Sequence, residues 1–208
     1  MTRNIGVNIR RDKVETILTC SNLAEAIQKH DGGGVIMLEL PTETYFELST
    51  ASVKFLTDNG FEGIYISFQR PFKNISSFFK HQEIDMNKLL IIDGATAYCG
   101  EVQDRNPRCV QISPAIDIDG LVQTICTSLS KLKSKERFVF IDSLTTMALY
   151  EPFSEMARFS EFLISALRKR DIKNVTFLFN VSEDLSQKRF IKNMARYVDE
   201  SIHVGLCT

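Results

Sequence analysis

The sequence predicts a three-layer α/β/α domain whose central sheet is mostly parallel and has about seven strands. Seven short runs of β-branched and aromatic residues are spaced along the 208 residues, and stretches with helical periodicity separate them. Several of these runs are apolar at successive positions, which is typical of strands that helices cover on both faces. Alternating strands and helices of this kind indicate a doubly covered α/β sheet.

The predicted strands follow one another along the whole chain. They are Val35–Leu40, Gly63–Phe68, Leu89–Asp93, Cys109–Ile112, Phe138–Asp142, Val175–Asn180 and Ile202–Leu206. No linker, repeat or low-complexity segment divides the chain, so we expect residues 1–208 to form a single domain. Ligands of open parallel sheets bind at the carboxyl ends of the strands, and functional residues are therefore expected just after each strand.

Two of the predicted helices stand out by their apolar periodicity. The stretch after Pro152 repeats apolar residues every three or four positions and ends in the cations Arg168, Lys169 and Arg170. The stretch after Asp119 has the same periodicity, and we expect the Asp119 side chain to cap its N-terminus.

Composition excludes several classes of protein. Hydrophobic residues make up 44% and charged residues 25%, which is typical of a soluble globular domain. The net charge of −1 provides no overall field that would attract nucleic acid or an anionic membrane. The apolar runs are much shorter than the roughly 20 residues of a membrane span. The five cysteines are scattered without a C-x-x-C pair. We therefore expect a cytoplasmic protein without a metal site.

The polar residues that follow the strands form recognisable motifs. The run Phe138-Val139-Phe140-Ile141-Asp142-Ser143 looks like the Walker B strand of RecA and KaiC proteins, and Gly32-Gly33-Gly34 before Val35–Leu40 resembles the strand that leads into their phosphate loop. Gly63–Phe68 resembles their second strand. The ordered similarity spans about residues 22 to 206, so the chain resembles a RecA-superfamily ATPase domain of the KaiC-like branch. The resemblance implies a RecA-like fold, and similar degenerate chains suggest an archaeal source.

The position of the phosphate loop lacks the residues that such a loop requires. Glycines must let backbone N–H groups wrap the phosphates, a Lys reaches the terminal phosphates, and a Ser or Thr binds Mg²⁺. The segment here reads Leu40-Pro41-Thr42-Glu43-Thr44-Tyr45-Phe46-Glu47, without a glycine, and no Lys or Arg occurs from Val35 to Val53. The carboxylates of Glu39, Glu43 and Glu47 would repel a triphosphate.

A capping box accounts for the same segment without a ligand. Thr44 and Glu47 have the spacing at which a threonine and a glutamate satisfy the free N–H groups of a helix N-terminus. We therefore expect the helix that begins here to be closed by its own side chains rather than to bind an anion.

The residues that would activate water are also altered. Gln69, followed by Arg70, stands where the resembled enzymes have an acidic residue after the second strand. A glutamine can orient water but cannot accept its proton. We therefore expect no catalytic residue and no ATP hydrolysis by the mechanism of the family. We expect Asp142 and Ser143 to end a buried strand rather than to hold a metal.

Three functions remain open from the sequence. The preferred one is a non-catalytic binding or regulatory module, for instance in signalling, that binds a protein partner. The second is a nucleotide sensor that binds ATP or ADP without turnover, although no cofactor is expected. The third is a nucleic-acid-associated accessory protein related to recombinases, because cations gather at Lys131–Arg137 and at Lys188–Arg196. The chain is expected to be a monomer or a small homo-oligomer, away from membranes.

Overall fold

The computed structural model of the chain describes residues 18–30, 33–99, 104–113, 117–146, 152–168, 174–183 and 189–204. Within these residues, seven strands form one sheet in the order β4-β3-β2-β5-β6-β1-β7. Every neighbouring pair of strands is parallel. The predicted α/β sheet is therefore confirmed.

The elements follow the predicted order closely. The strands are β1 (Gly34–Leu40), β2 (Glu62–Ser67), β3 (Leu89–Asp93), β4 (Cys109–Val110), β5 (Arg137–Asp142), β6 (Val175–Ser182) and β7 (Glu200–His203). The helices are residues 18–29, α2 (Tyr45–Asp58), α3 (Phe72–His81), α4 (Gly94–Tyr98), α5 (Ile118–Leu129), α7 (Phe153–Arg168) and α9 (Arg189–Met194). Two 3₁₀ turns, η1 (Thr42–Thr44) and η2 (Met86–Lys88), precede α2 and β3.

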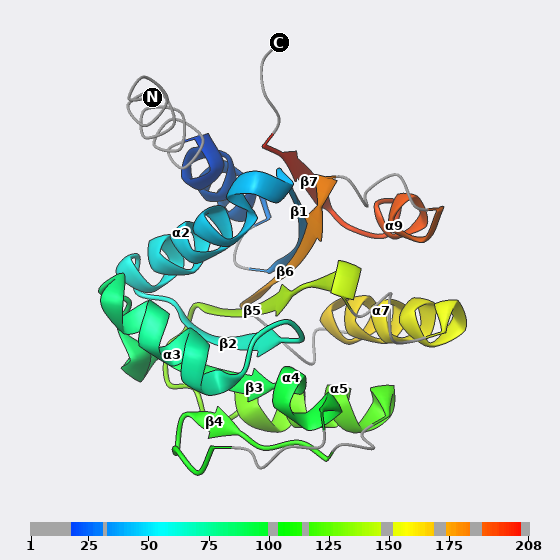
Figure 1. Cartoon of the computed structure of the whole chain (residues 1–208). Helices are drawn as coiled ribbons and strands as arrows, with labels where there is room; N and C mark the ends of the chain where they lie inside the picture. The colour runs from blue at the N-terminus through cyan, green and yellow to red at the C-terminus, as the bar shows by residue number, and fades with distance from the viewer. Residues whose placement is uncertain are drawn as a thin grey trace, which may run out of the picture.

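Helices cover the sheet on both sides (Figure 1). The helix of residues 18–29, α2 and α3 lie on one face, and α4, α5, α7 and α9 lie on the other. Successive residues of β1 alternate between the two layers: Ile36 and Leu38 belong to the core under α2, and Val35 and Met37 to the opposite core. All four side chains are buried, which explains why the strand is apolar at every position. None of the described helices combines the length and apolarity needed to cross a membrane.

The ring of Phe138 on β5 lies over Gly63, its partner on β2, in the space that a side chain at position 63 would need. A Cβ atom built on Gly63 would lie 2.4 Å from ring atoms of Phe138 on β5, closer than real carbon contacts. The Phe138 ring is completely buried and therefore cannot move aside into solvent. A glycine is required here for close packing rather than for an unusual backbone angle.

The N-terminus of α5 differs from the prediction. The cap is Asp117, whose carboxylate accepts a hydrogen bond of 2.8 Å from the N–H of Gly120. Asp117 has the extended backbone (φ −84°, ψ 174°) that an N-cap residue adopts. The predicted cap, Asp119, was wrong: it lies inside the first turn and forms an ion pair with Arg158 of α7.

Chain connections leave the centre of the sheet in opposite directions. From β1 the chain passes through α2 to β2, which lies toward the β4 edge of the sheet. From β6, the neighbour of β1, it passes through α9 to β7, which forms the other edge. The same reversal separates β2, which leads outward to β3, from its neighbour β5, which leads back to β6. Ligands of parallel α/β sheets bind at such reversals, beside the carboxyl ends of the strands.

Candidate functional site

A hollow of about 640 Å³ lies at the carboxyl ends of β1, β2, β5 and β6, where both reversals occur. Six of its lining residues lie in the segments after β1, β2 and β5, Ser182 ends β6, and the others belong to α2 and α3. They are Thr42, Glu43, Tyr45, Phe46, Glu47, Gln69, Arg70, Phe78, Thr145, Thr146 and Ser182. The structure thus brings the predicted phosphate-loop position together with the residues that follow β2. Pro41 directly follows β1 and is buried, and it does not belong to the lining of the hollow.

The carboxylate of Asp142 is enclosed behind this hollow. Asp142 is the last residue of β5 and only 1% exposed. One of its oxygens accepts a 2.7 Å hydrogen bond from the hydroxyl of Tyr45, and the other accepts a short hydrogen bond from the hydroxyl of Tyr65. Both oxygens of the Walker B-like aspartate therefore have a protein donor.

Burial dominates the protonation behaviour of this cluster. It raises the pKa of Asp142 above its ordinary value, and the hydroxyls of Tyr65 and Tyr45 and the charge of Arg70 oppose that rise. Burial, followed by the negative charge of Asp142, raises the pKa of Tyr45 and of Tyr65 well above their ordinary values. Both tyrosines therefore stay protonated, and remain hydrogen-bond donors, at neutral pH and above it.

Packing fixes the two hydroxyls on the carboxylate. The ring of Tyr65 stacks on Phe140 with centroids 5.4 Å apart and meets Phe79 edge-on at 5.1 Å. Tyr45 opens α2, and one turn later Ser49 accepts a 2.6 Å hydrogen bond from the side-chain amide of Asn180 on β6. The helix is thus tied to the sheet beside the tyrosine. Tyr45 thus lines the hollow and also donates its hydroxyl to Asp142.

A network of hydroxyl groups joins the strand ends around the hollow. The hydroxyls of Thr42 and Ser182, after β1 and at the end of β6, lie 2.7 Å apart. The N–H of Ser182 donates to the hydroxyl of Thr145, which follows β5. This network joins the carboxyl ends of β1, β5 and β6.

Gln69 is also held by protein groups. Its side-chain amide donates to the hydroxyls of Ser143 and Thr146, at 3.1 and 2.9 Å. The two hydroxyls are themselves 3.1 Å apart, and the N–H of Thr146 donates to Ser143. The predicted pair Asp142 and Ser143 therefore meets the predicted pair Gln69 and Arg70 at the ends of β5 and β2, with each side chain engaged by a neighbour.

Arg70 provides the cation of the hollow, and an aromatic pair supports it. The Arg70 guanidinium lies 3.6 Å from the centre of the Phe46 ring, a cation–π arrangement. Phe46 in turn packs against Phe78 of α3, with ring centres 4.5 Å apart. Glu43 and Glu47 line the same hollow as exposed carboxylates, so its lining carries more negative than positive charge.

The predicted capping box is absent. Thr44 is the N-cap residue of α2, but its side chain makes no capping hydrogen bond. Its backbone (φ −114°, ψ 11°) continues the 3₁₀ turn Thr42–Thr44 and is not extended as in a capping box. The prediction that Thr44 and Glu47 close this helix was therefore wrong.

Two other aspartates at or next to strand ends, Asp93 and Asp199, do not line this hollow. Asp93 accepts hydrogen bonds from the N–H groups of Thr96 and Phe72 and from the Thr96 hydroxyl, so it organises the starts of α4 and α3. Asp199 accepts from the N–H of Val35, at the opposite edge of the sheet. Within the described residues, no three His, Cys, Asp or Glu side chains gather in a way that could hold a metal ion.

Tyr65 is the site residue that sequence reasoning missed. It pairs with Phe140 on the neighbouring strand, two positions before Asp142, and therefore points to the same face of the sheet. The available signal was a single hydroxyl-bearing aromatic inside the apolar run Gly63–Phe68. That signal gains meaning only when the parallel pairing of β2 with β5 is known.

Comparison with known proteins places the chain in a family. Residues 15–206 match the model of a family described as "Family of unknown function (DUF7090)". The chain belongs to this family. A comparison with curated proteins found no match for this DUF7090 member.

Solved structures share the fold of the DUF7090 chain. It is similar to the uncharacterised protein PH0321 from Pyrococcus horikoshii, solved in complex with an unknown peptide, with a TM-score of 0.61 and 14% identity over 82% of this chain and 76% of the other. It is also similar to the KaiC-like protein PH0186 from Pyrococcus horikoshii OT3, with a TM-score of 0.57 and 14% identity over 82% and 70% of the two chains. The RecA-like fold implied by the sequence motifs is thereby supported.

Proposed function

We propose that this DUF7090 chain is a non-catalytic module on a RecA/KaiC-like scaffold, which acts as a binding or regulatory protein and does not hydrolyse ATP. The observation that carries the proposal is the enclosure of Asp142. Both of its oxygens accept hydrogen bonds from tyrosine hydroxyls, and the residue is almost completely buried. A Walker B aspartate has to face the metal and its water, which this arrangement prevents.

The phosphate-binding chemistry supports the same proposal. No Lys or Arg occurs between Val35 and Val53, and the segment after β1 contributes Glu43 and Glu47 to the hollow. Carboxylates in a partly dehydrated site repel a triphosphate. Gln69 donates its amide protons to Ser143 and Thr146 instead of holding a water molecule for attack. We infer that the phosphate loop of the ancestral scaffold is degenerate here.

A protein segment is the ligand that we propose for the hollow. Its lining combines hydroxyl and amide groups, an aromatic pair and charges of both signs, which together suit the mixed chemistry of a peptide better than that of a polyphosphate. The related fold of PH0321 was solved with an unknown peptide. We propose that the protein acts in the cytoplasm through such a partner.

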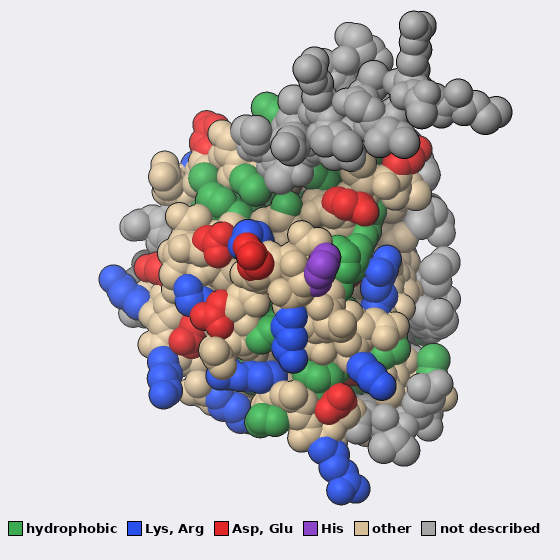
Figure 2. Space-filling view, turned by 60° about the vertical axis from the view of Figure 1, so that its left-hand side comes forward, with side chains coloured by type: hydrophobic (Ala, Val, Ile, Leu, Met, Phe, Trp, Pro, Cys, Tyr) green, Lys and Arg blue, Asp and Glu red, His purple; other side chains and the backbone are tan. Residues whose placement is uncertain are grey.

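A nucleotide sensor is the second candidate, and a specific observation favours it. The N-terminus of α2 has no side-chain cap and opens beside Thr42, at the hollow. Free N–H groups at a helix N-terminus attract anions. The recombinase-like alternative has less support, because Lys188 lies outside the described residues and the net charge of −1 provides no overall attraction for nucleic acid. The face shown in Figure 2 carries blue and red side chains side by side.

Calorimetric titration with ATP and ADP, with and without Mg²⁺, tests the proposal. We expect no heat of binding at millimolar nucleotide and no phosphate release. Micromolar binding that Arg70→Ala removes and Lys73→Ala preserves would place a nucleotide in the hollow and establish the sensor instead. Lys73 is a suitable control, because it is an exposed cation close to Arg70 in sequence but outside the lining.

A further inference from the structure

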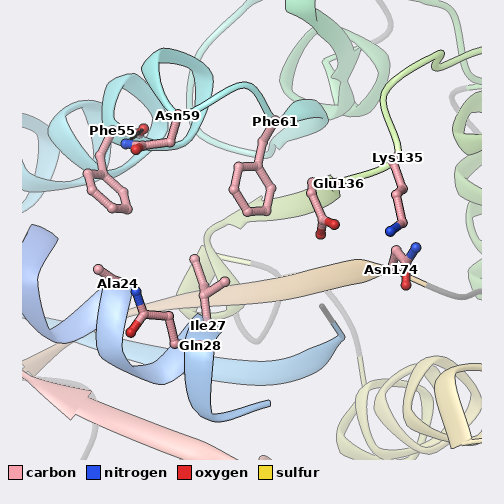
Figure 3. A pocket seen from close by; sticks show the side chains of 9 residues that line it. All are labelled: Ala24, Ile27, Gln28, Phe55, Asn59, Phe61, Lys135, Glu136 and Asn174. Atoms are coloured by element: carbon pink, nitrogen blue, oxygen red, sulfur yellow. Dashed lines mark hydrogen bonds between the residues drawn. The ribbon is translucent and has the colours of Figure 1, made fainter. Parts of the chain in front are cut away.

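A second hollow, of about 630 Å³, lies at the opposite edge of the sheet (Figure 3). One wall is the helix of residues 18–29, and another is the C-terminal half of α2. The residues just before β2, β5 and β6 complete it, so it faces the amino ends of the strands and not their carboxyl ends. Its volume is in the range of small-molecule sites.

We propose that this hollow binds a small, uncharged, planar aromatic molecule that carries both a hydrogen-bond donor and an acceptor. The proposal is independent of the function assigned to the carboxyl-end hollow, since the two share no lining residue.

Aromatic and aliphatic side chains form the part of the hollow that would accept a flat ring. Phe55 of α2 and Phe61, just before β2, point into the gap from one side, and Ile27 points toward them from the other (Figure 3). All three are only half-buried although they pack against the core under α2. No ring contact joins Phe55 to Phe61 in the described part of the chain, so a ligand ring could contact both.

Three carboxamides supply the polar edge. Gln28, Asn59 and Asn174 line the hollow on three different elements. Asn59 donates its side-chain amide to the carbonyl of Phe55, which leaves its carbonyl oxygen as an acceptor. Among the described residues, the side chains of Gln28 and Asn174 make no hydrogen bond with another protein group. Carboxamides donate and accept, and therefore match a ligand edge that does both.

The charges at the hollow cancel. Lys135 and Glu136 are consecutive lining residues of opposite sign, and they are the only charged groups in the lining. A cationic or an anionic ligand would gain from one of them and be repelled by the other. An uncharged ligand avoids this conflict, and it is the class that the carboxamides recognise best.

Three isosteric probes test the proposal: benzamide, benzoate and benzamidine, which are uncharged, anionic and cationic. Binding to the full chain is followed by ligand-observed NMR titration. We expect saturable binding of benzamide, at least several-fold tighter than that of either charged probe. Phe61→Leu should lower the affinity for benzamide about fivefold, because an aromatic contact is lost. Gln28→Ala should lower it about threefold, because a hydrogen bond is lost.

Matched controls exclude an effect on folding. Phe162→Leu makes the same substitution at an exposed phenylalanine of α7, outside the hollow, and should leave benzamide binding unchanged. Gln28 is exposed, so its variant should keep the melting temperature of the parent and gives a result even if Phe61→Leu unfolds. Absence of saturable benzamide binding, equal affinity for the three probes, or wild-type affinity in Gln28→Ala would overturn the proposal. None of these outcomes bears on nucleotide binding at the other edge, because the probes carry no phosphate.

Discussion

The hydroxyl of Tyr45 should contribute measurably to stability, and Tyr45→Phe removes it without changing the ring. Its 2.7 Å hydrogen bond ends on an Asp142 oxygen in a residue that is 1% exposed, so water cannot readily replace the lost donor. A hydrogen bond to a charged acceptor contributes about 1.5–3 kcal/mol to the free energy of unfolding. For a chain of this length, a loss of about 2 kcal/mol corresponds to a fall in melting temperature of about 4–8 °C.

The effect of Tyr45→Phe should also depend on pH in a defined direction. The Tyr45 hydroxyl lowers the pKa of Asp142 and so favours its ionised form, although burial keeps that pKa above its ordinary value. The destabilisation by Tyr45→Phe is therefore largest above the pKa of Asp142 in the folded protein. It should shrink, toward the value of a neutral hydrogen bond of about 1 kcal/mol, as the pH falls through that pKa.

Urea and thermal unfolding followed by circular dichroism measure both effects. Tyr197→Phe is the matched control, since Tyr197 is 55% exposed and the same change there should alter the free energy of unfolding by less than about 0.5 kcal/mol. If Tyr45→Phe proved as mild as Tyr197→Phe at neutral pH, the hydroxyl would not be held by Asp142. The proposed loss of the metal-binding role would then lack its main support.

Two further substitutions test the packing and the helix cap. Gly63→Ala should destabilise the protein by about 1–3 kcal/mol in a urea titration, because its methyl group meets a buried ring, whereas Gly33→Ala, with 3.6 Å to its nearest neighbour, should be tolerated. Equal stability of the two variants would contradict the close packing of the Phe138 ring on position 63. Asp117→Ala should lower the free energy of unfolding by about 1 kcal/mol, because α5 loses its N-cap. Asp119→Ala should lower it by less, because only an exposed ion pair is lost. If thermal melts gave the reverse order, Asp119 would be the cap.

Sequence patterns predicted the strands well because burial on both faces leaves a simple signature. The apolar run of β1 and the strand β3 (Leu89–Asp93) were recognisable without any tertiary information. The sequence also placed candidate residues just after the strands, and several of them line the carboxyl-end hollow, because parallel strands bring their carboxyl ends to one edge of the sheet. Caps were predicted poorly: Thr44 has the right neighbours in sequence, but its backbone belongs to a 3₁₀ turn that no local pattern indicates.

The contacts of Asp142 could not be predicted, because they depend on which strands are neighbours. Tyr45 lies 97 residues and Tyr65 lies 77 residues from Asp142 along the chain. Their hydroxyls reach it only because β2 pairs with β5 and because α2 packs over the centre of the sheet. The motif comparison therefore drew attention to the aspartate through its resemblance to a Walker B residue, but it gave no indication that two phenols engage it.

The aspartate and its two tyrosines form an interdependent unit, so the carboxylate has a structural role that does not depend on a bound metal. Replacing Asp142 alone by an apolar residue would leave two buried hydroxyls without their acceptor, and each unpaired group costs about 1–3 kcal/mol. Removing either tyrosine alone weakens the compensation for a buried charge. Any single loss is thus unfavourable even when no cation is bound. The contacts of Asp142 therefore account for this Walker B-like motif by local packing, and such a motif indicates nucleotide hydrolysis only where the carboxylate is free to face a ligand.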